Sequence, residues 1–186
     1  MRVISGTARG TKLTALPGGD VTRPTVDRVK EGMFSAVQFL LPGARVLDLF
    51  AGSGQLGIEA LSRGAARCVF LDASREACGV VRQNLKAAGL FEKASLSQGE
   101  AESYLARCTE QFDLVLLDPP YHHGTVVAVL PAVDRVTAPG GMVLAETERG
   151  APLPQRCGNL ALKKQYNYGK VTLSRYEKDM EATKES

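Results

Sequence analysis

A carboxylate followed by two prolines and an aromatic ring ends an apolar run, in the stretch FDLVLLDPPY over residues 112–121. Proline fixes φ and has no backbone N–H, so the chain after Asp118 is stiff and its carbonyls are available as acceptors. A carboxylate and a carbonyl suit the two N–H groups of an exocyclic amine, and an aromatic ring can stack on the planar base that carries it. The candidate catalytic residues are therefore Asp118, Pro119, Pro120 and Tyr121. The structural alternative is a turn that merely ends a strand.

A glycine-rich loop is the second candidate site. VLDLFAGSGQLG contains Gly52, Gly54 and Gly57 in the order G-x-G-x-x-G, between an apolar strand pattern and a helix pattern. Asp72 ends the next strand pattern about 20 residues later, which is the spacing of a ribose-binding acid in a dinucleotide site. Glycines used only for a tight strand–helix turn are the alternative.

Asp48, which stands just before this loop, argues against a dinucleotide. A pyrophosphate beside a carboxylate would be repelled, whereas a cationic ligand would be attracted. S-adenosylmethionine carries a sulfonium and an ammonium group, a ribose and an adenine, but no phosphate. We therefore predict that it binds here, with Asp72 accepting hydrogen bonds from the ribose and Glu100 beside the adenine. An ordinary acid in the first turn of a helix is the alternative for Glu100. The remaining residues expected to bind the donor are Phe50, Gly52, Ser53, Gly54, Ala73, Ala101 and Asp118.

Together the two motifs predict methyl transfer to a nucleobase amine. The amine nitrogen would be aimed at the methyl carbon of the sulfonium, and positioning for in-line displacement would supply most of the acceleration. A base inside a helix cannot reach such a pocket, so it must be unstacked or flipped out. Adenine N6, cytosine N4 and guanine N2 present similar amines, so these residues alone leave the base open.

The elements that must position these residues alternate from about residue 45 onward. Such alternation predicts an α/β fold with a mostly parallel sheet, helices on both faces and ligands beyond the carboxyl ends of the strands. Strands are expected over 44–50, 67–72, 94–99, 112–118 and 141–148, and helices over 54–64, 74–89, 100–108 and 124–137.

Three further segments lie outside the alternation. Residues 1–22 suggest a small β-hairpin, 25–41 an amphipathic helix, and 160–178 two antiparallel strands joined at NYGK. We expect one domain over 1–178, made of an N-terminal extension (1–41) and a catalytic core (42–178), followed by a disordered tail (179–186).

The charge is unevenly distributed along the chain. Residues 1–31 carry six basic and three acidic groups, 32–148 carry nine and thirteen, and 149–178 carry seven and one. Basic segments before and after an acidic body suggest a polyanionic partner, because phosphate contacts supply most non-specific nucleic-acid affinity. Merely solvated basic faces are the alternative.

Other features argue against several classes of protein. The four cysteines are scattered and His122 and His123 are adjacent, so we expect neither a metal site nor a disulfide framework. No apolar run is long enough to span a bilayer, and the N-terminus lacks a secretory signal. A cytoplasmic protein with no membrane partner is expected, and we predict a monomer.

Three stretches give the chain a family resemblance. MRVISGTARGTKL, TRPTVDRVKEGMFSAV and LFAGSGQLGIEALSRGA, together with LDPPY, resemble the bacterial RsmD family. The resemblance implies a Rossmann-like class I methyltransferase that methylates N2 of a guanine in 16S ribosomal RNA, within the small ribosomal subunit or its assembly intermediate. It also implies RNA-binding roles for Arg23, Thr25 and Arg28, and the basic C-terminal segment adds Lys163 and Lys164. Asp72 departs from the family, which more often has glutamate there.

Other functions remain open alongside this one. A methyltransferase could act on another nucleobase amine, such as adenine N6 in DNA or RNA. The three glycines would also suit an NAD-dependent oxidoreductase, and the basic segments a non-catalytic RNA-binding or assembly factor.

Overall fold

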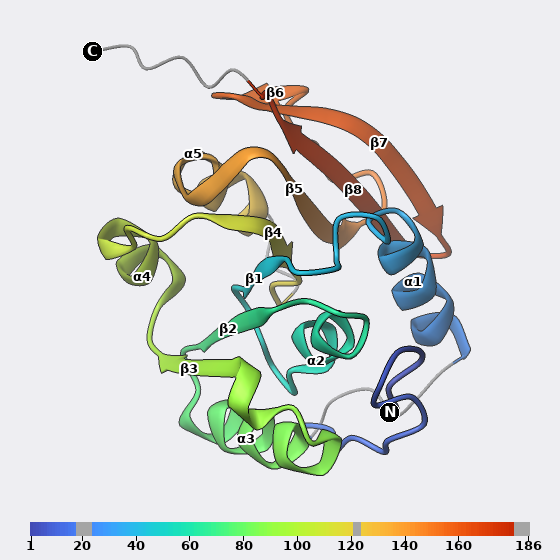
Figure 1. Cartoon of the computed structure of the whole chain (residues 1–186). Helices are drawn as coiled ribbons and strands as arrows, with labels where there is room; N and C mark the ends of the chain where they lie inside the picture. Colours follow the sequence, from blue (N-terminus) through green and yellow to red (C-terminus); the bar gives the residue numbers. More distant parts are fainter. Residues whose placement is uncertain (18–23, 121–123, 181–186) are drawn as a thin grey trace.

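A single mixed sheet organises the protein, with its strands in the order β3-β2-β1-β4-β5-β8-β7-β6 (Figure 1). The computed structural model describes residues 1–17, 24–120 and 124–180. The strands are β1 (Arg45–Asp48), β2 (Arg67–Asp72), β3 (Ala94–Gln98), β4 (Phe112–Leu117), β5 (Thr137–Glu148), β6 (Arg156–Cys157), β7 (Leu160–Tyr168) and β8 (Val171–Lys178). The helices are α1 (Pro24–Ser35), α2 (Gln55–Ser62), α3 (Arg75–Ala88), the 3₁₀ turn η1 (Phe91–Lys93), α4 (Ala101–Arg107) and α5 (Thr125–Val136).

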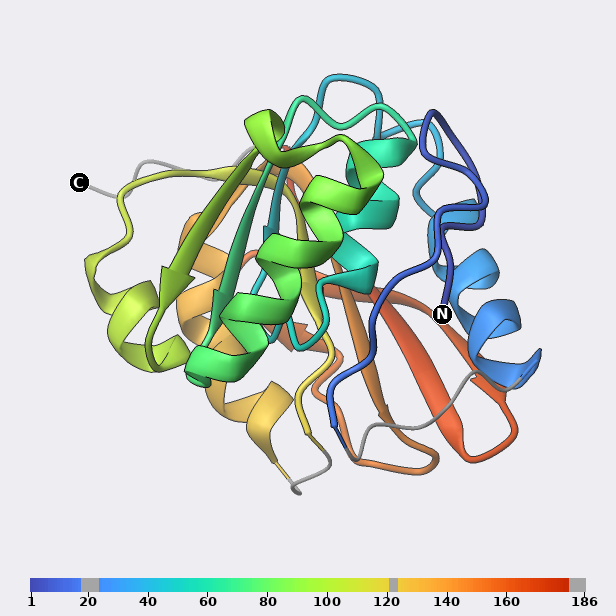
Figure 2. The same ribbon diagram turned by 90° about the horizontal axis from the view of Figure 1, so that it is seen from below.

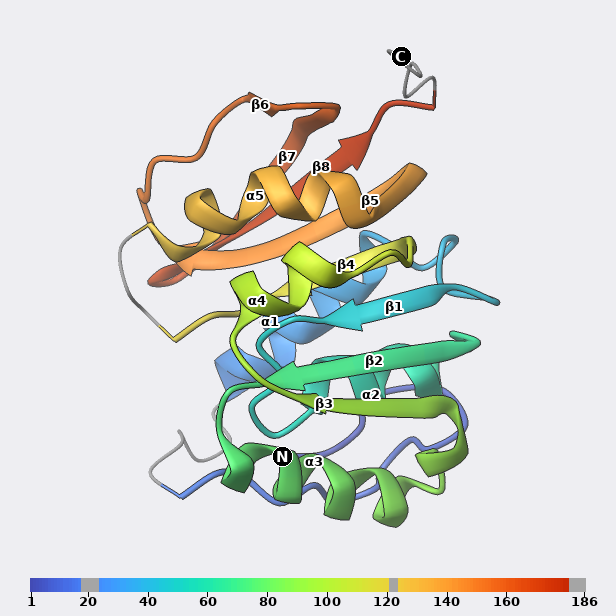
Figure 3. The ribbon, with the colours of Figure 1, turned by 90° about the vertical axis from the view of Figure 1, so that its left-hand side faces the viewer.

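The first five strands are parallel, as the β–α alternation predicts. From β1 the chain adds β2 and β3 on one side and β4 and β5 on the other, so the strand order reverses between β1 and β4 (Figure 3). In open parallel sheets of this kind, ligands bind beyond the carboxyl ends of the strands at that reversal.

Helices cover both faces of the sheet, and each face has its own apolar core. On the α1–α3 face, side chains such as Val46, Phe70 and Leu116 pack against α1, α2 and α3. On the α4–α5 face, their neighbours along the strands, such as Leu47 and Val115, pack against α4 and α5. Figures 1 and 2 show the two helix layers on either side of the sheet. Alternate strand residues thus serve opposite cores, which makes these strands apolar throughout.

Most predicted elements are confirmed to within two residues of their ends. In α3, the Ser74 hydroxyl accepts a hydrogen bond from the Ala77 N–H at 3.2 Å, and Gly89 ends the helix with a φ of 67°. Both features were expected from the residue types. The fifth strand is longer than predicted, because Thr137 already pairs with Phe112 and an irregularity in register accommodates the Pro-Gly-Gly stretch that follows.

The N-terminal extension differs from the prediction in two ways. The expected hairpin is reduced to one isolated antiparallel bridge, Arg2 to Lys12, closed by backbone hydrogen bonds across a turn. The helix predicted over 25–41 ends at Ser35 and continues only as turns. Val37 is nevertheless buried, so the apolar periodicity reflected packing beyond the helix itself.

The two predicted C-terminal strands are confirmed as an antiparallel pair that extends the sheet beyond β5. β7 has a bulge between Leu162 and Lys164. Leu162 packs against the α4–α5 face, whereas Tyr166 and Tyr168 pack against the α1–α3 face. The bulge therefore changes which side chains face which layer.

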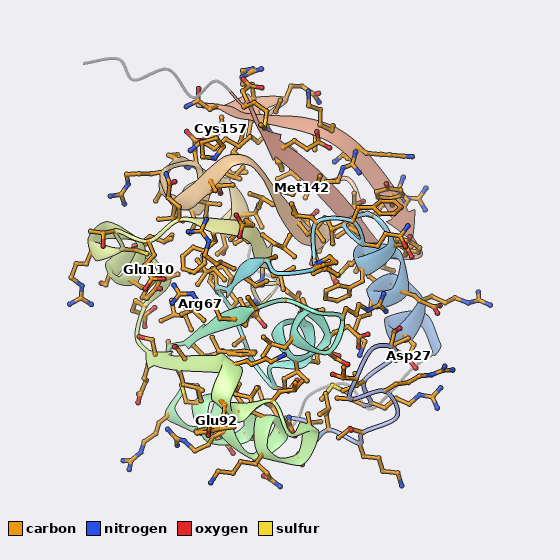
Figure 4. The ribbon with its side chains drawn as sticks, viewed as in Figure 1. Asp27, Arg67, Glu92, Glu110, Met142 and Cys157 are labelled. Carbon is orange, nitrogen blue, oxygen red and sulfur yellow. The ribbon has the colours of Figure 1, made fainter. Side chains whose placement is uncertain are left out.

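Exposed ion pairs link strands β2, β1 and β4 at their amino ends. Arg67 of β2 pairs with Glu110, which precedes β4, and Figure 4 shows these two side chains together. Arg45 of β1 pairs with Asp113 of β4 at 3.1 Å. These contacts lie at the opposite edge from the motifs described below. Within 1–17, 24–120 and 124–180, no helix has the length and apolar character to cross a membrane.

Candidate active site

Four carboxylates stand at the carboxyl ends of four adjacent parallel strands. Asp72 belongs to β2, Asp48 to β1, Asp118 directly follows β4, and Glu146 lies near the end of β5. Residues two positions earlier, including Phe70, Leu116 and Leu144, all pack in the α1–α3 core. Since side chains alternate along a strand, the four acids share that face of the sheet. The strand reversal lies between Asp48 and Asp118.

Asp48 is buried, with a side chain only partly satisfied by the protein. Its Oδ2 accepts a hydrogen bond from the Gly57 N–H at 2.9 Å, whereas its Oδ1 is buried with no hydrogen-bond partner among the residues that the structure describes. Burial raises the pKa of Asp48 to about 7, the Gly57 hydrogen bond opposes this shift, and the charge of Asp72 adds to it. A buried carboxylate oxygen without a donor is costly, so a ligand that brings a donor or a positive charge would be favoured here.

The glycines of the loop serve distinct structural purposes. Gly52 has a φ of 54° and Gly54 a φ of 78°, a left-handed backbone that favours glycine. Gly57 lies inside α2, where an added Cβ would collide with Phe70 and Cys68 of β2. The first two glycines thus shape the loop, and the third allows close packing between helix and sheet.

Asp72 holds the loop as well as facing it. Its Oδ2 accepts from the Gly52 N–H at 2.8 Å, and its Oδ1 accepts from the Ser74 N–H at 2.8 Å. Each carboxylate oxygen has a further lone pair, so the predicted contact with ribose hydroxyls remains chemically open. The sequence pattern gave no sign of the two backbone contacts.

Asn84 of α3 is a site residue that sequence reasoning missed. Its Nδ2 donates to the carbonyl oxygens of Ser53 at 2.8 Å and Thr14 at 2.9 Å, and its Oδ1 accepts from the Thr14 N–H at 2.8 Å. A buried amide therefore ties the N-terminal segment to the glycine loop. The available signal was a polar residue beside Leu85 on the buried side of a predicted amphipathic helix.

The other predicted donor-binding residues surround the loop with differing exposure. Ser53 is buried, and its hydroxyl contacts the sulfur of Met1 at 3.7 Å, so its side chain faces the N-terminus. Ala73 and Glu100 are exposed at the ends of β2 and β3, whereas Phe50 and Ala101 pack against the α4–α5 core. The exposed Glu100 precedes α4 without a side-chain capping hydrogen bond.

The Asp118 stretch continues from β4 across the strand reversal. Asp118 is half-buried, Pro119 is buried and Pro120 is exposed. Burial, and then the charges of Glu146 and Asp48, raise the pKa of Asp118 well above its ordinary value. Such crowding of carboxylates is typical of sites that receive positive charge or N–H donors. Tyr121 lies outside the described residues.

A cavity of about 860 Å³ opens beside this stretch, and we call it the β5 cavity. It is lined by residues 119–120, 124–128, 146–148 and 151–154. Most of its wall is apolar, and two acidic residues of β5, Glu146 and Glu148, are among its lining residues. Neither the cavity nor Glu146 was anticipated, because the cavity forms only where the end of β5 and the start of α5 meet the segment before β6.

The predicted RNA-binding residues come from two distant parts of the chain. Arg28 is exposed on α1, and Lys163 and Lys164 are exposed on β7. The Lys164 ammonium lies 5.0 Å from the centre of the Tyr166 ring. α1 packs beside the β7–β8 pair, where an Arg175 Nη1 donates to the Ala36 carbonyl at 3.2 Å (Figure 1). Arg23 and the side chain of Thr25 lie outside the described residues.

The four cysteines are free thiols. Among the side chains the structure describes, no group of three or more His, Cys, Asp or Glu is arranged to hold a metal ion. His122 and His123 lie outside those residues.

Known proteins resemble this chain along nearly its whole length. The family model described as Conserved hypothetical protein 95 matches residues 1–177. The Bacillus subtilis protein YlbH is 39% identical over 183 residues, covering 96% of this chain and 99% of that protein. Ribosomal RNA small subunit methyltransferase D of Escherichia coli K12 is 32% identical over 181 residues, covering 96% and 90%.

Solved structures of similar proteins have the same fold as this chain. The Escherichia coli protein yhhF aligns with a TM-score of 0.86 at 31% identity, covering 97% of this chain and 98% of that one. An RNA methyltransferase from Salinibacter ruber, solved with S-adenosyl-L-homocysteine, aligns with a TM-score of 0.65 at 20% identity, covering 89% and 98%, which shows a shared fold. The fold is that of the Rossmann-like methyltransferases, and the chain belongs to the RsmD family.

Proposed function

We propose that this protein transfers a methyl group from S-adenosylmethionine to the exocyclic N2 amine of a guanine in 16S ribosomal RNA. The observation that carries the proposal is that Asp48 and Asp118 lie on either side of the strand reversal. Asp48 is opposite Leu116, so the two acids end neighbouring strands on one face, two residues out of step. Strand geometry then puts their backbones on the order of 8 Å apart, which suits a donor and an acceptor held side by side.

The residues around Asp48 fit the methyl donor. Within the described parts of the chain, the buried Oδ1 of Asp48 has no hydrogen-bond partner, and the left-handed Gly52 and Gly54 keep side chains away from the mouth of the loop. Asp48 would attract the cationic part of the donor, and Asp72 would accept from its ribose. The donor supplies a methyl carbon bound to a positively charged sulfur. The neighbour from Salinibacter ruber, solved with the demethylated product, supports this assignment through its fold.

Asp118 and the two prolines fit the acceptor. The carboxylate and the Pro119 carbonyl would accept the two N–H groups of the amine and point the nitrogen lone pair at the methyl carbon. As the new C–N bond forms, the C–S bond breaks, and a proton then leaves the nitrogen for Asp118 or water. The raised pKa of Asp118 makes it a suitable proton acceptor once the nitrogen has become acidic.

Relatives and charge support ribosomal RNA as the substrate. The Escherichia coli relative carries the name of a small-subunit ribosomal RNA methyltransferase. The basic residues of α1 and β7 form a surface that could contact phosphates, with Lys163 and Lys164 exposed. We further propose that residues 1–41 serve the RNA side, that 42–178 form the catalytic core, and that the protein acts as a cytoplasmic monomer on the small subunit or its assembly intermediate.

The Asp118→Ala variant tests this function. Small subunits from cells lacking the protein are incubated with labelled S-adenosylmethionine, and their RNA is digested to nucleosides. The wild type should produce N2-methylguanosine. Asp118→Ala should lose more than 99% of the transfer while donor binding, followed by calorimetry, stays within about threefold.

Asp113→Ala is the matched control on the same strand. Asp113 forms an exposed ion pair at the opposite end of β4, so its loss should cost about 1 kcal/mol or less and leave transfer intact. Full activity of Asp118→Ala would remove Asp118 from the mechanism. Label in N6-methyladenosine would favour the other nucleobase amine, and tight NADH binding without donor binding would favour an oxidoreductase.

A further inference from the structure

Glu146 occupies a position that the proposed function does not yet use. Leu117 of β4 pairs with Ala145 of β5, so Asp118 and Glu146, the next residue on each strand, stand side by side. Both belong to the residue set that faces the α1–α3 layer, and adjacent strands are about 4.8 Å apart. Glu146 also lines the β5 cavity together with Pro119 and Pro120. Its carboxylate therefore stands beside the amine-holding group, at the wall of a space of about 860 Å³.

The three candidate amines differ in the ring nitrogen beside them. In guanine, N1 next to the N2 amine carries a hydrogen. In adenine, N1 next to the N6 amine carries a lone pair, and so does N3 of cytosine next to N4. An ionised carboxylate can accept hydrogen bonds but cannot donate them. It therefore attracts the N1–H of guanine and repels the lone pair of adenine N1 or cytosine N3. The base that a neighbouring carboxylate selects is thus guanine.

We propose that Glu146 determines base specificity, accepting the N1–H of guanine while Asp118 and the Pro119 carbonyl accept the two hydrogens of the N2 amine. The assignment rests on the proposed function and names the group that chooses its substrate. Three N–H donors along one edge of the base then meet two adjacent carboxylates and one carbonyl. The largely apolar wall of the β5 cavity receives the rest of the nucleotide, and its volume lies within the usual range of ligand pockets.

The electrostatics of the pocket agree with this arrangement. Glu146 is the main charged neighbour that, after burial itself, raises the pKa of Asp118. Two carboxylates that repel one another in the empty pocket gain from a ligand edge made of donors. A base edge with a lone pair at the central position would add to the repulsion instead.

A base analogue separates this role from a structural one. 2-Aminopurine keeps the amine at C2 but has a lone pair at N1 and lacks O6. Small subunits are reconstituted with 16S RNA that carries guanine or 2-aminopurine at the methylated position, and kcat/KM is measured for both. The wild type should prefer guanine by at least 100-fold. Glu146→Gln, whose amide can donate to the N1 lone pair, should lower that preference at least tenfold.

The loss of O6 affects both enzymes alike, so the change in preference isolates the contact at N1. Glu92→Gln is the matched control, because Glu92 is exposed on η1 at the β3 edge of the sheet, outside the described lining of the β5 cavity. It should keep the wild-type preference. Calorimetry with S-adenosylmethionine checks that each variant is folded.

The kinetic results distinguish a specificity role of Glu146 from a failure of the proposed function. A Glu146→Gln variant that slows with both bases while its preference stays unchanged would overturn the specificity role. A Glu92→Gln variant with the same loss of preference would overturn the assignment to Glu146. If the wild type transfers no label to guanine at all, the proposed function itself fails, which is distinguishable from either result.

Discussion

At the scale of single residues, Asp48 carries an energetic cost that its site explains. The pKa of Asp48 in the folded protein is about 7, against an ordinary value of 3.8. At neutral pH part of the population therefore carries a buried negative charge. The favourable contribution of Asp48 to folding is complete below pH 4 and is lost as the pH rises through 7. A site that binds a cation uses that anion, so stability and donor affinity should respond to pH in opposite directions.

Asp48→Asn tests this opposition. The asparagine can still accept from the Gly57 N–H but carries no charge, so at pH 8 the ligand-free variant should be more stable than the wild type by roughly 2–4 kcal/mol. At pH 5, still above the ordinary pKa of 3.8, that difference should shrink to about 1–2 kcal/mol, and it should approach zero only below pH 4. Urea unfolding at the two pH values measures it, and a variant less stable than the wild type at pH 8 would contradict the account.

The same residue sets the pH dependence of donor binding. Wild-type affinity for S-adenosylmethionine should rise up to tenfold per pH unit below 7 and level off above it, because only the ionised Asp48 attracts the donor. Calorimetry should show this slope in the wild type and its loss in Asp48→Asn, together with at least 100-fold weaker binding. An equal slope in both proteins would assign the titration to another group.

At the scale of elements, the N-terminal segment is fastened to helices on the α1–α3 face. Glu59 of α2 accepts from the N–H groups of Ile4 and Ser5 at 2.8 and 2.9 Å, and it also pairs with Lys30 of α1 at 3.6 Å. Both charged side chains are buried. Further along, Asn84 fastens the segment to the glycine loop. The extension that precedes the core is therefore part of the donor site's support.

Asn84→Asp should weaken the loop by removing both hydrogen bonds that the Asn84 Nδ2 donates. The carboxylate can still accept from the Thr14 N–H but cannot donate to the Ser53 and Thr14 carbonyls. We expect a loss of about 1–3 kcal/mol in stability, because buried acceptors are left unpaired, and at least tenfold weaker donor binding. Unfolding and calorimetry measure the two effects. Unchanged donor affinity in Asn84→Asp would show that the hydrogen bonds of Asn84 do not support the glycine loop in donor binding.

Glu59→Gln tests the buried ion pair in the same layer. It leaves the buried Lys30 ammonium, and the Arg63 guanidinium that lies 2.8 Å from Glu59, without their shared counter-charge, so stability should fall by about 3–5 kcal/mol. The double variant Glu59→Gln with Lys30→Met removes the unpaired charge and should recover more than half of that loss. An additive loss in the double variant would show that the pair is not the source of the effect.

At the scale of the whole molecule, the basic C-terminal strands and α1 lie toward one end of the sheet. The β7–β8 end and α1 carry exposed basic residues, whereas β3 and α3 form the opposite edge (Figure 1). The carboxyl ends of the strands open between these two edges. A polyanion attracted to the basic end would therefore lie near the β5 side of the candidate site, where the acceptor is proposed to bind.

Removing two charges from β7 should change the salt dependence of RNA binding. Each phosphate contact contributes a slope of about 0.7–0.9 in a plot of log affinity against log salt. Lys163→Gln with Lys164→Gln should therefore lower the slope by about 1.5, as measured by filter binding to small-subunit RNA. Lys86→Gln with Lys93→Gln makes the same charge change at the opposite edge and should leave the slope unaltered. Equal slopes for both pairs would place the RNA elsewhere.

Local sequence patterns were enough to predict most of the elements. Apolar alternation, Ser74, Gly89 and the loop glycines are local signals, since each reflects the conformation of its own few residues. The carboxyl-end positions of Asp48 and Asp118 followed from the strand pattern alone. The hairpin and the length of the first helix were less accurate, because turns and packing beyond Ser35 replace regular hydrogen bonding there.

Only the tertiary structure decided which side chains meet. Glu146 stands beside Asp118 because β4 and β5 pair in one register, and that register depends on two cores packing across the sheet. Asn84 reaches Ser53 and Thr14 only once α3 lies over the loop. Contacts between segments about 30 to 70 residues apart leave no periodic trace in either segment, because each is fixed by the packing of the whole rather than by local conformation.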